Sequence, residues 1–186
     1  MSKEVNTEIY IDASPEAVWD ILTSLDLYQD WNPLITSSSG IVEVGETLTN
    51  RFKPPGGRAR TFAVQVTVVD RAHLFAWNGR LLGMPRLFEG RHRFKLEDTP
   101  PGTRLTHSEE FSGLAGPLIL RKSLLAQTEA GFTAMNKALK TRAEAQTTST
   151  YPATSRQQGP RHQIRPSGAG RPAPIRSERS VAGQRH

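Results

Sequence analysis

One long amphipathic helix, preceded by many short strands, constrains the fold of this chain more than any other feature. The helix is predicted over residues 116–144, and its apolar side chains recur at steps of three, four or their sums, which places them on one face: Leu120, Leu124, Phe132, Met135 and Leu139. Gly131 interrupts this face where a close backbone approach would be useful. At about 1.5 Å per residue, the helix is roughly 40 Å long, which is too long for an ordinary crossover. A helix of this length against a curved antiparallel sheet predicts a hollow between them, so ligand binding is the leading hypothesis.

The residues before this helix alternate between apolar and polar in short segments, as strands do. Strands are expected over residues 5–12, 41–44, 47–53, 61–69, 73–78, 87–97 and 104–111, with turns rich in Gly and Pro between them. After the first strand, Ser14-Pro15-Glu16 has the composition of a helix start, because Ser14 can cap and Pro15 suits the first helical position. A second short helix is expected over residues 26–31. Antiparallel strands bracketed by helices indicate an α+β fold.

Charge is distributed unevenly along the 186 residues. Residues 147–186 hold seven Arg and one acidic residue, whereas residues 1–146 hold 17 basic and 17 acidic side chains and are neutral overall. The net charge of +6 therefore comes from the C-terminal segment and is no evidence that the domain binds nucleic acid. That segment is rich in Arg, Pro, Gly and Ser and too poor in apolar residues to offset its ordering entropy. We expect one domain over residues 1–146 and a disordered tail over residues 147–186.

The seven Arg of the tail could contact nucleic acid or anionic lipid without specificity. They are scattered and no aromatic stacking pattern accompanies them, so a solvated extension without function is the alternative. No specific nucleic-acid partner is expected.

The N-terminal residues lack the apolar stretch of a secretory signal. No segment approaches the roughly 20 apolar residues that are needed to span a bilayer. The sequence contains no cysteine, which agrees weakly with a reducing compartment. These features predict a cytoplasmic protein without a membrane span and leave its oligomeric state open.

The last predicted hairpin carries three ionisable side chains on its apolar side. On residues 87–97, one face is apolar apart from His92, while the other is charged. On residues 104–111, His107 and Glu109 lie on the same face as the apolar side chains. The long helix is expected to cover this face.

The register of the hairpin follows from these patterns. Directly opposed residues lie on the same face of a sheet, so the two apolar faces must coincide. If Leu96 pairs with Leu105, His92 lies opposite Glu109. A shift by two residues would also keep the apolar faces together, whereas a shift by one residue would bury Arg and Lys.

Several functions suit His92, His107 and Glu109 in an apolar pocket. They could fix the orientation of a ligand by hydrogen bonds, or they could form a satisfied structural contact. A His–Glu pair could also perform general acid–base catalysis, since burial and a neighbouring carboxylate perturb both pKa values. Two histidines and a carboxylate are possible metal ligands, but cross-strand positions without a short-spacing motif are a weak signal. Neither a metal nor a cofactor is expected.

Five segments carry a family resemblance. They are Ile9-x-Ile11-x-Ala13-Ser14-Pro15-Glu16-x-Val18-Trp19 with Tyr28-x-x-Trp31-Asn32-Pro33, then Phe88-x-Gly90-x-His92-x-Phe94-x-Leu96 with Glu109-x-Phe111-x-Gly113, and finally Phe132-x-x-Met135-Asn136-x-x-Leu139-Lys140. They resemble the opening, the closing strands and the closing helix of the START-like, or Bet v 1-like, superfamily, to which the bacterial SRPBCC and polyketide cyclase/dehydrase families belong. The likeness covers residues 5–144 and omits the tail.

The resemblance implies a helix-grip fold, in which an antiparallel sheet of about seven strands wraps around the C-terminal helix and encloses an apolar cavity. It implies that the chain binds a hydrophobic small molecule, lipid-like or polyketide-like, as its partner. Eight residues are placed at the cavity: Trp31, Phe62, Trp77, Phe88, His92, His107, Glu109 and Phe111.

Two other functions are open within the same superfamily. The first is an enzyme of the cyclase or dehydratase type, a lyase or isomerase, in which His92 or His107 acts with Glu109 to move a proton next to a carbonyl. The second is a partner-binding domain like the chaperone activators, which would suit a helix packed solidly onto the sheet. No motif in the sequence fixes a reaction, so an enzyme would rest on analogy of fold alone.

Overall fold

The computed structural model describes residues 2–80, 87–114 and 121–150. The elements in chain order are β1 (Lys3–Ile11), α1 (Pro15–Thr23), the 3₁₀ turn η1 (Leu25–Leu27), α2 (Tyr28–Trp31), β2 (Ile35–Ser39), β3 (Thr47–Phe52), β4 (Arg60–Asp70), β5 (Leu74–Arg80), β6 (Glu89–Thr99), β7 (Gly102–Ser112) and α4 (Lys122–Thr150). No helix among these residues is long and apolar enough to cross a membrane.

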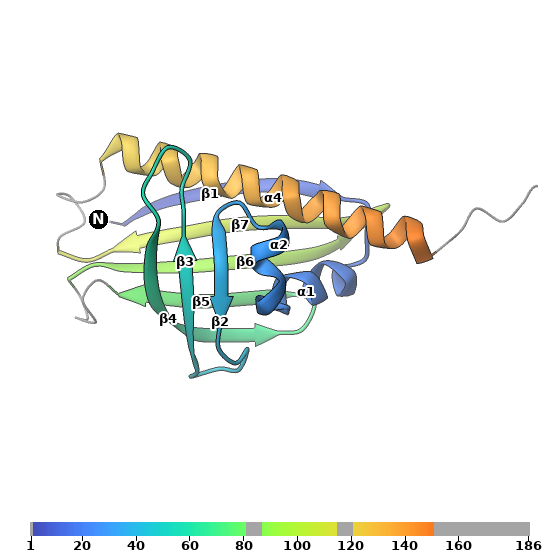
Figure 1. Cartoon of the computed structure of the whole chain (residues 1–186), viewed down its shortest axis with the longest axis horizontal. Helices are drawn as coiled ribbons and strands as arrows, with labels where there is room; N and C mark the ends of the chain where they lie inside the picture. Colours follow the sequence, from blue (N-terminus) through green and yellow to red (C-terminus); the bar gives the residue numbers. More distant parts are fainter. Residues whose placement is uncertain (1, 81–86, 115–120, 151–186) are drawn as a thin grey trace, which may run out of the picture. The chain divides into compact units, whose positions relative to one another are not determined.

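The seven strands form one antiparallel sheet in the order β1-β7-β6-β5-β4-β3-β2. This order places β1 beside β7, so the first and last strands are neighbours. The sheet curves, with β2–β4 crossing the direction of β5–β7, and α4 lies across its concave face (Figure 1). The predicted α+β helix-grip arrangement is therefore confirmed.

The short helices begin and end where side chains supply hydrogen bonds to free backbone groups. Ser14 Oγ accepts the N–H of Ala17 at 3.3 Å, and Pro15 is the first residue of α1, as the cap pattern predicts. After α2, Asn32 Oδ1 accepts the backbone N–H groups of Leu34 at 3.0 Å and Ile35 at 2.9 Å. This turn directs the chain from the helix into β2.

Helix α4 begins at Lys122 and continues to Thr150, four residues past the predicted domain boundary at 146. Part of the predicted start, residues 116–120, lies outside the described residues, as does the tail from residue 151. The predicted apolar face packs on the sheet through Phe132, Met135 and Leu139, which are fully buried. A Cβ on Gly131 would lie 2.7 Å from Leu34 Cδ1, so this glycine permits the close approach that the sequence suggests.

The two halves of α4 differ in burial. From Gly131 to Ala143 the helix buries its inner face completely, whereas residues 122–130 include no buried residue. In that first half, Leu124 and Leu125 are half-buried and pack against the edge of the core. The helix is therefore tightly packed on the sheet through its second half only.

A salt-bridged pair on α4 binds the backbone at the end of β1. Lys140 Nζ donates to the carbonyl oxygen of Tyr10 at 2.8 Å, and Glu144 Oε1 accepts the N–H of Asp12 at 2.8 Å. The two side chains also pair with each other, one helical turn apart. The pair ties the second half of α4 to an edge strand of the sheet.

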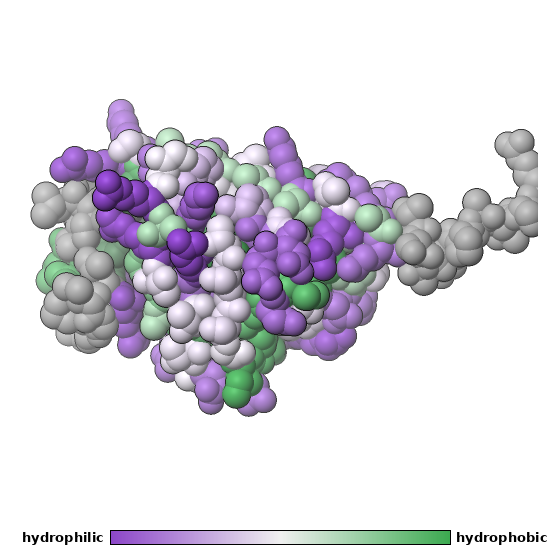
Figure 2. All heavy atoms as spheres, viewed as in Figure 1, coloured by the Kyte–Doolittle hydropathy of each residue, from purple (hydrophilic) through white to green (hydrophobic). Residues whose placement is uncertain are grey.

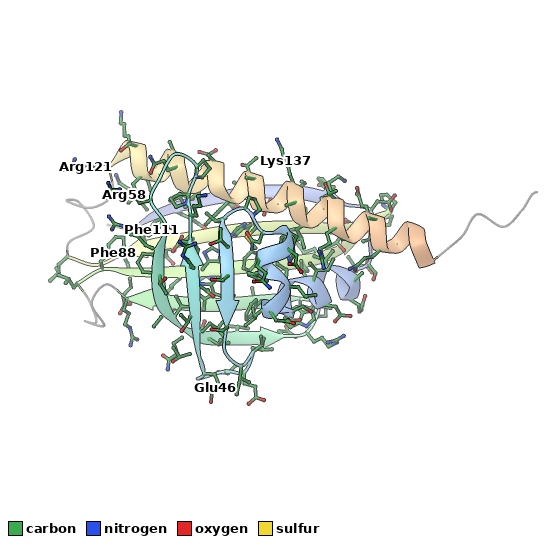
Figure 3. The ribbon with its side chains drawn as sticks, in the orientation of Figure 1. Glu46, Arg58, Phe88, Phe111, Arg121 and Lys137 are labelled. Atoms are coloured by element: carbon green, nitrogen blue, oxygen red, sulfur yellow. The ribbon has the colours of Figure 1, made fainter. Side chains whose placement is uncertain are left out.

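The strand predicted over residues 41–44 is wrong. The strand is instead β2, Ile35–Ser39, which pairs with β3, and Gly40 at φ 130° ends it. Ile41 is 58% exposed and Val44 is 64% exposed, and Figure 2 shows a hydrophobic surface at this edge of the domain, near Glu46 in Figure 3. The serine-rich sequence of β2 does not have the apolar pattern of a strand, whereas the following loop contains apolar residues and was therefore predicted as one.

Candidate functional site

The β6–β7 hairpin places the predicted ionisable residues on the concave face. Leu96 pairs with Leu105 and His92 lies opposite Glu109, so the predicted register is confirmed. Glu110 lies on the other face, within 4.0 Å of Arg91 and Arg93. Glu109 and Glu110 therefore do not form a carboxylate pair.

His92 and His107 contact each other through their rings. Their Nε2 atoms are 2.8 Å apart, and His107 Nδ1 is 2.8 Å from Asn136 Oδ1. Asn136 Nδ2 donates to Thr7 Oγ1 at 3.0 Å, and Thr7 Oγ1 donates to the carbonyl oxygen of His107 at 3.2 Å. One chain of hydrogen bonds thus joins β6, β7, α4 and β1.

Aromatic rings enclose both histidines. Trp77 stacks on His92 with ring centroids 4.5 Å apart and an interplanar angle of 6°. Phe132 stacks on His107 at 3.7 Å and 14°. Both imidazoles are buried, so this part of the concave face is filled by side chains.

The environment favours neutral forms of all three ionisable groups. Burial lowers the pKa of His92 to about 3. Burial and the neighbouring His92 lower the pKa of His107 well below its ordinary value, against the hydrogen bond to Asn136. Burial also raises the pKa of Glu109 to about 7. His92 Nδ1 and Glu109 Oε2 are 3.6 Å apart, yet these shifts oppose an ion pair between them.

Glu109 lies between the buried histidines and solvent. Its side chain is 21% exposed, compared with 1% for His92. A Cβ on Gly90 would collide with Glu109 Oε1, so this glycine provides the space for the carboxyl group. Among the described residues, no three His, Asp or Glu side chains are placed to hold a metal ion.

Some of the predicted aromatic residues lie in the core, and others lie at the end of the sheet where α4 begins. Trp77 is buried beneath His92, whereas Phe88 and Phe111 stack at 5.8 Å at the end where α4 begins, marked by Arg121 in Figure 3. Phe62 is 38% exposed.

Phe52 connects Phe62 to His92, whereas Trp31 contacts Tyr28 edge-to-face at 5.3 Å. Phe62 contacts Phe52 edge-to-face at 5.8 Å, and Phe52 in turn contacts His92 at 6.3 Å. Trp31 is half-buried, and its Nε1 is buried without a hydrogen-bond partner among the described residues.

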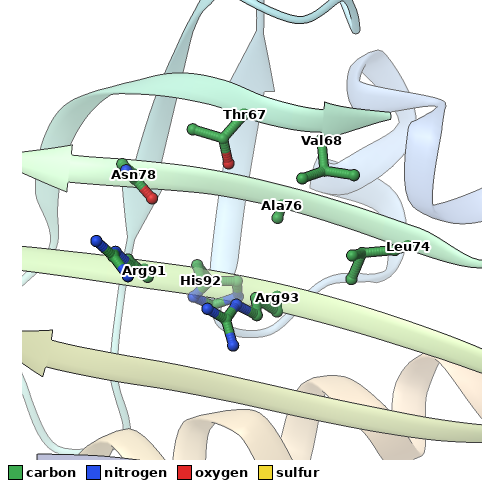
Figure 4. A pocket seen from close by; sticks show the side chains of 8 residues that line it. All are labelled: Thr67, Val68, Leu74, Ala76, Asn78, Arg91, His92 and Arg93. Atoms are coloured by element: carbon green, nitrogen blue, oxygen red, sulfur yellow. The ribbon is translucent and has the colours of Figure 1, made fainter. Parts of the chain in front are cut away.

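A depression of about 240 Å³ lies on the opposite face of the sheet, between β4, β5 and β6 (Figure 4). Its lining is largely polar or charged: Thr67, Val68, Leu74, Ala76, Asn78, Arg91, His92 and Arg93. The two arginines pair with Glu110. Charged side chains therefore border this surface.

Sequence reasoning missed three members of the arrangement: Asn136, Thr7 and Phe52. Asn136 is a polar residue within the apolar face of α4, four residues after Phe132, and Thr7 lies between Val5 and Ile9 on the inner side of β1. A polar residue at an inward position was the available signal for both. Direct contact between the histidines was also missed, because they are diagonal neighbours and not opposed ones.

Solved structures of low sequence identity share this fold. The Zhui aromatase/cyclase from Streptomyces sp. R1128 is 18% identical, with 79% of this chain and 96% of that chain covered at a TM-score of 0.64. Ara h 8.0201 is 14% identical, with 78% and 99% covered at 0.61. Protein MLL2253 from Mesorhizobium loti is 21% identical, with 78% and 98% covered at 0.58.

A search of curated proteins gave no match. The model of the family described as polyketide cyclase / dehydrase and lipid transport, however, matches residues 2–144, which is nearly all of the described domain. With its START-like, Bet v 1-like fold, the chain belongs to this family.

Proposed function

We propose that the chain binds a hydrophobic small molecule, lipid-like or polyketide-like, between the concave face of the sheet and the first half of α4. The observation that carries the proposal is the unequal packing of α4. From Gly131 to Ala143 the inner face of the helix is buried against the core, whereas residues 122–130 present half-buried leucines. Membership of a family described by polyketide cyclization and lipid transport supports this kind of ligand.

The residues of the sheet near the first half of α4 have the chemistry of an apolar binding site. Phe52, Phe62 and Phe88 are all incompletely buried, and aromatic surface is a strong source of binding free energy. Glu109 supplies a polar group beside them, as ligand pockets commonly require for orientation. His92 and His107 lie deeper and act through Glu109.

A neutral fluorescent probe tests this location. Nile red is expected to bind the full chain with increased fluorescence. Phe88→Glu and Leu124→Glu should each weaken that binding about tenfold, because each places a charge against apolar surface. Ile41→Ser is the matched control, since Ile41 is an exposed apolar residue of the β2–β3 loop, which lies away from α4 (Figure 1). If Ile41→Ser reduces binding and the other two variants do not, the proposed location is wrong.

The natural ligand requires a separate measurement. Native mass spectrometry of the full chain purified from cells, followed by denaturing extraction, should reveal a stoichiometric apolar compound. A chain that carries nothing and does not bind Nile red would refute the proposed function.

A cyclase or dehydratase activity is the second candidate, and the Glu109 carboxyl favours it. Its pKa of about 7 suits proton transfer at neutral pH, whereas the buried histidines remain neutral and are poor bases. Benzoylacetone, a 1,3-diketone, is a suitable probe because proton exchange at its central carbon in D₂O can be followed by NMR. Exchange accelerated by the full chain and lost in Glu109→Gln supports an enzyme; an unchanged exchange rate supports a binding protein.

A further inference from the structure

The hydrogen bonds behind Glu109 have a single possible direction. The chain of hydrogen bonds ends at the carbonyl oxygen of His107. This oxygen can only accept, so Thr7 Oγ1 donates to it. Thr7 Oγ1 then accepts from Asn136 Nδ2, and Asn136 Oδ1 is left facing His107 Nδ1. An amide oxygen accepts only, so His107 carries its proton on Nδ1.

The direction continues through both imidazoles. Because His107 is neutral, its Nε2 is unprotonated and accepts the Nε2–H of His92. His92 is neutral as well, so its Nδ1 is a bare acceptor. This buried atom has no hydrogen-bond partner among the described residues, and Glu109 Oε2 is 3.6 Å away.

A protonated Glu109 completes this arrangement. Its Oε2–H can donate to His92 Nδ1 after a small rotation, which leaves Oε1 as an acceptor on a side chain that is 21% exposed. A carboxylate at this position would face the lone pair of His92 instead. The room for Oε1 is the space left by the missing side chain of Gly90.

We propose that Thr7 and Asn136 are positioning residues that fix the tautomers of His107 and His92, so that Glu109 is held as a neutral acid that accepts a hydroxyl hydrogen of the ligand. The ligand step rests on the proposed function. A neutral molecule with a hydroxyl group fits this site, because its O–H would donate to Glu109 in the same direction in which every other donor of the hydrogen-bond chain donates. A carboxylate ligand has no hydrogen to donate and would place its charge against acceptors.

The tautomers can be measured without a ligand. Long-range ¹H–¹⁵N spectra of ¹⁵N-histidine-labelled full chain at pH 6 should show His92 protonated at Nε2 only and His107 protonated at Nδ1 only. Asn136→Leu should abolish the fixed tautomer of His107, while Lys137→Gln, one residue further on the exposed face, should leave the spectrum unchanged. The wild-type spectrum decides the matter even if Asn136→Leu does not fold: a proton on His92 Nδ1 overturns the proposal.

Three probes test the ligand step: 4-butylphenol, its methyl ether 4-butylanisole, and 4-butylbenzoate. The phenol should bind about fivefold more tightly than the ether, the value of one hydrogen bond, and the benzoate should bind most weakly. Glu109→Gln retains an acceptor oxygen and should keep the preference for the phenol, whereas Glu109→Leu should lose it.

The outcomes separate this inference from the proposed function. Equal binding of phenol and ether by the wild type overturns the ligand step and leaves apolar binding intact. If none of these three probes binds although Nile red does, the ligand step fails and the proposed function stands. If Nile red does not bind either and no compound co-purifies, both fail, while the histidine spectrum still decides the positioning roles.

Discussion

Replacing Glu109 by glutamine should stabilise the domain at alkaline pH. Burial raises the pKa of Glu109 from 4.5 to about 7, so the folded state holds the proton more tightly than the unfolded state does. Each pKa unit corresponds to about 1.4 kcal/mol. At pH 8, where both states have lost the proton, the charged carboxyl therefore lowers the free energy of unfolding by about 3 kcal/mol.

The sign of the effect sets its pH window. A raised carboxyl pKa leaves stability intact below pH 4.5 and removes it progressively as the pH rises to about 7. Glutamine has the shape of the protonated acid and no charge, so Glu109→Gln avoids this loss. The variant should equal the wild type at pH 4 and exceed it by about 3 kcal/mol at pH 8.

Urea denaturation of both proteins between pH 4 and pH 9 measures this difference directly. Contributions from the buried histidines are common to both proteins and cancel in the comparison. Glu110→Gln is the control, because Glu110 is the next residue on the opposite face and only pairs with surface arginines. Its effect should stay within about 1 kcal/mol at every pH. Parallel curves for Glu109→Gln and the wild type would refute the reasoning that burial keeps this carboxyl neutral.

Three other substitutions probe separate parts of the structure. Gly90→Ala should push the Glu109 carboxyl towards solvent and lower its pKa towards 4.5, as followed by ¹³C NMR titration. Phe132→Ala removes the ring that stacks on His107 and should reduce the free energy of unfolding by about 3–5 kcal/mol in urea. Ser14→Ala removes the cap of α1 and should reduce it by about 1 kcal/mol in the same assay.

A specific outcome would contradict each of these predictions. An unchanged Glu109 titration in Gly90→Ala would show that the glycine does not provide its space. A loss below about 1 kcal/mol for Phe132→Ala would mean that the core closes over the missing ring. Ser14→Gly is the partner for Ser14→Ala, because glycine at a cap position should lower stability by only a few tenths of a kcal/mol.

The sequence predicted the sheet and the long helix well because their patterns depend on burial. Alternation on β6 and β7 excluded the one-residue shifts that would bury Arg and Lys, and the structure has the register in which Leu96 pairs with Leu105. The error over residues 41–44 has the opposite origin: Ile41 and Val44 are apolar but exposed, and polar Ser37 belongs to a strand. Local composition did not reveal which segment finds a pairing partner.

The site was predicted only in part for a related reason. The position of His92 opposite Glu109 follows from register, which is a property of two adjacent strands. The contact of His107 with Asn136 depends on how α4 crosses the sheet, and the bond between the two histidines depends on their side-chain rotamers. Neither is encoded in a local pattern, so the His–Glu pair was expected where a His–His–Asn–Thr chain is found.

The attachment of Lys140 and Glu144 to β1 has a consequence for aggregation. An edge strand exposes unpaired backbone groups that can recruit a strand from another molecule, and β1 is a nine-residue edge. The Lys140 ammonium and the Glu144 carboxylate occupy the carbonyl of Tyr10 and the N–H of Asp12. At the other edge, β2 has only five residues and an irregular register. The last turns of α4 thus discourage intermolecular strand pairing at the longer edge, a role independent of any ligand.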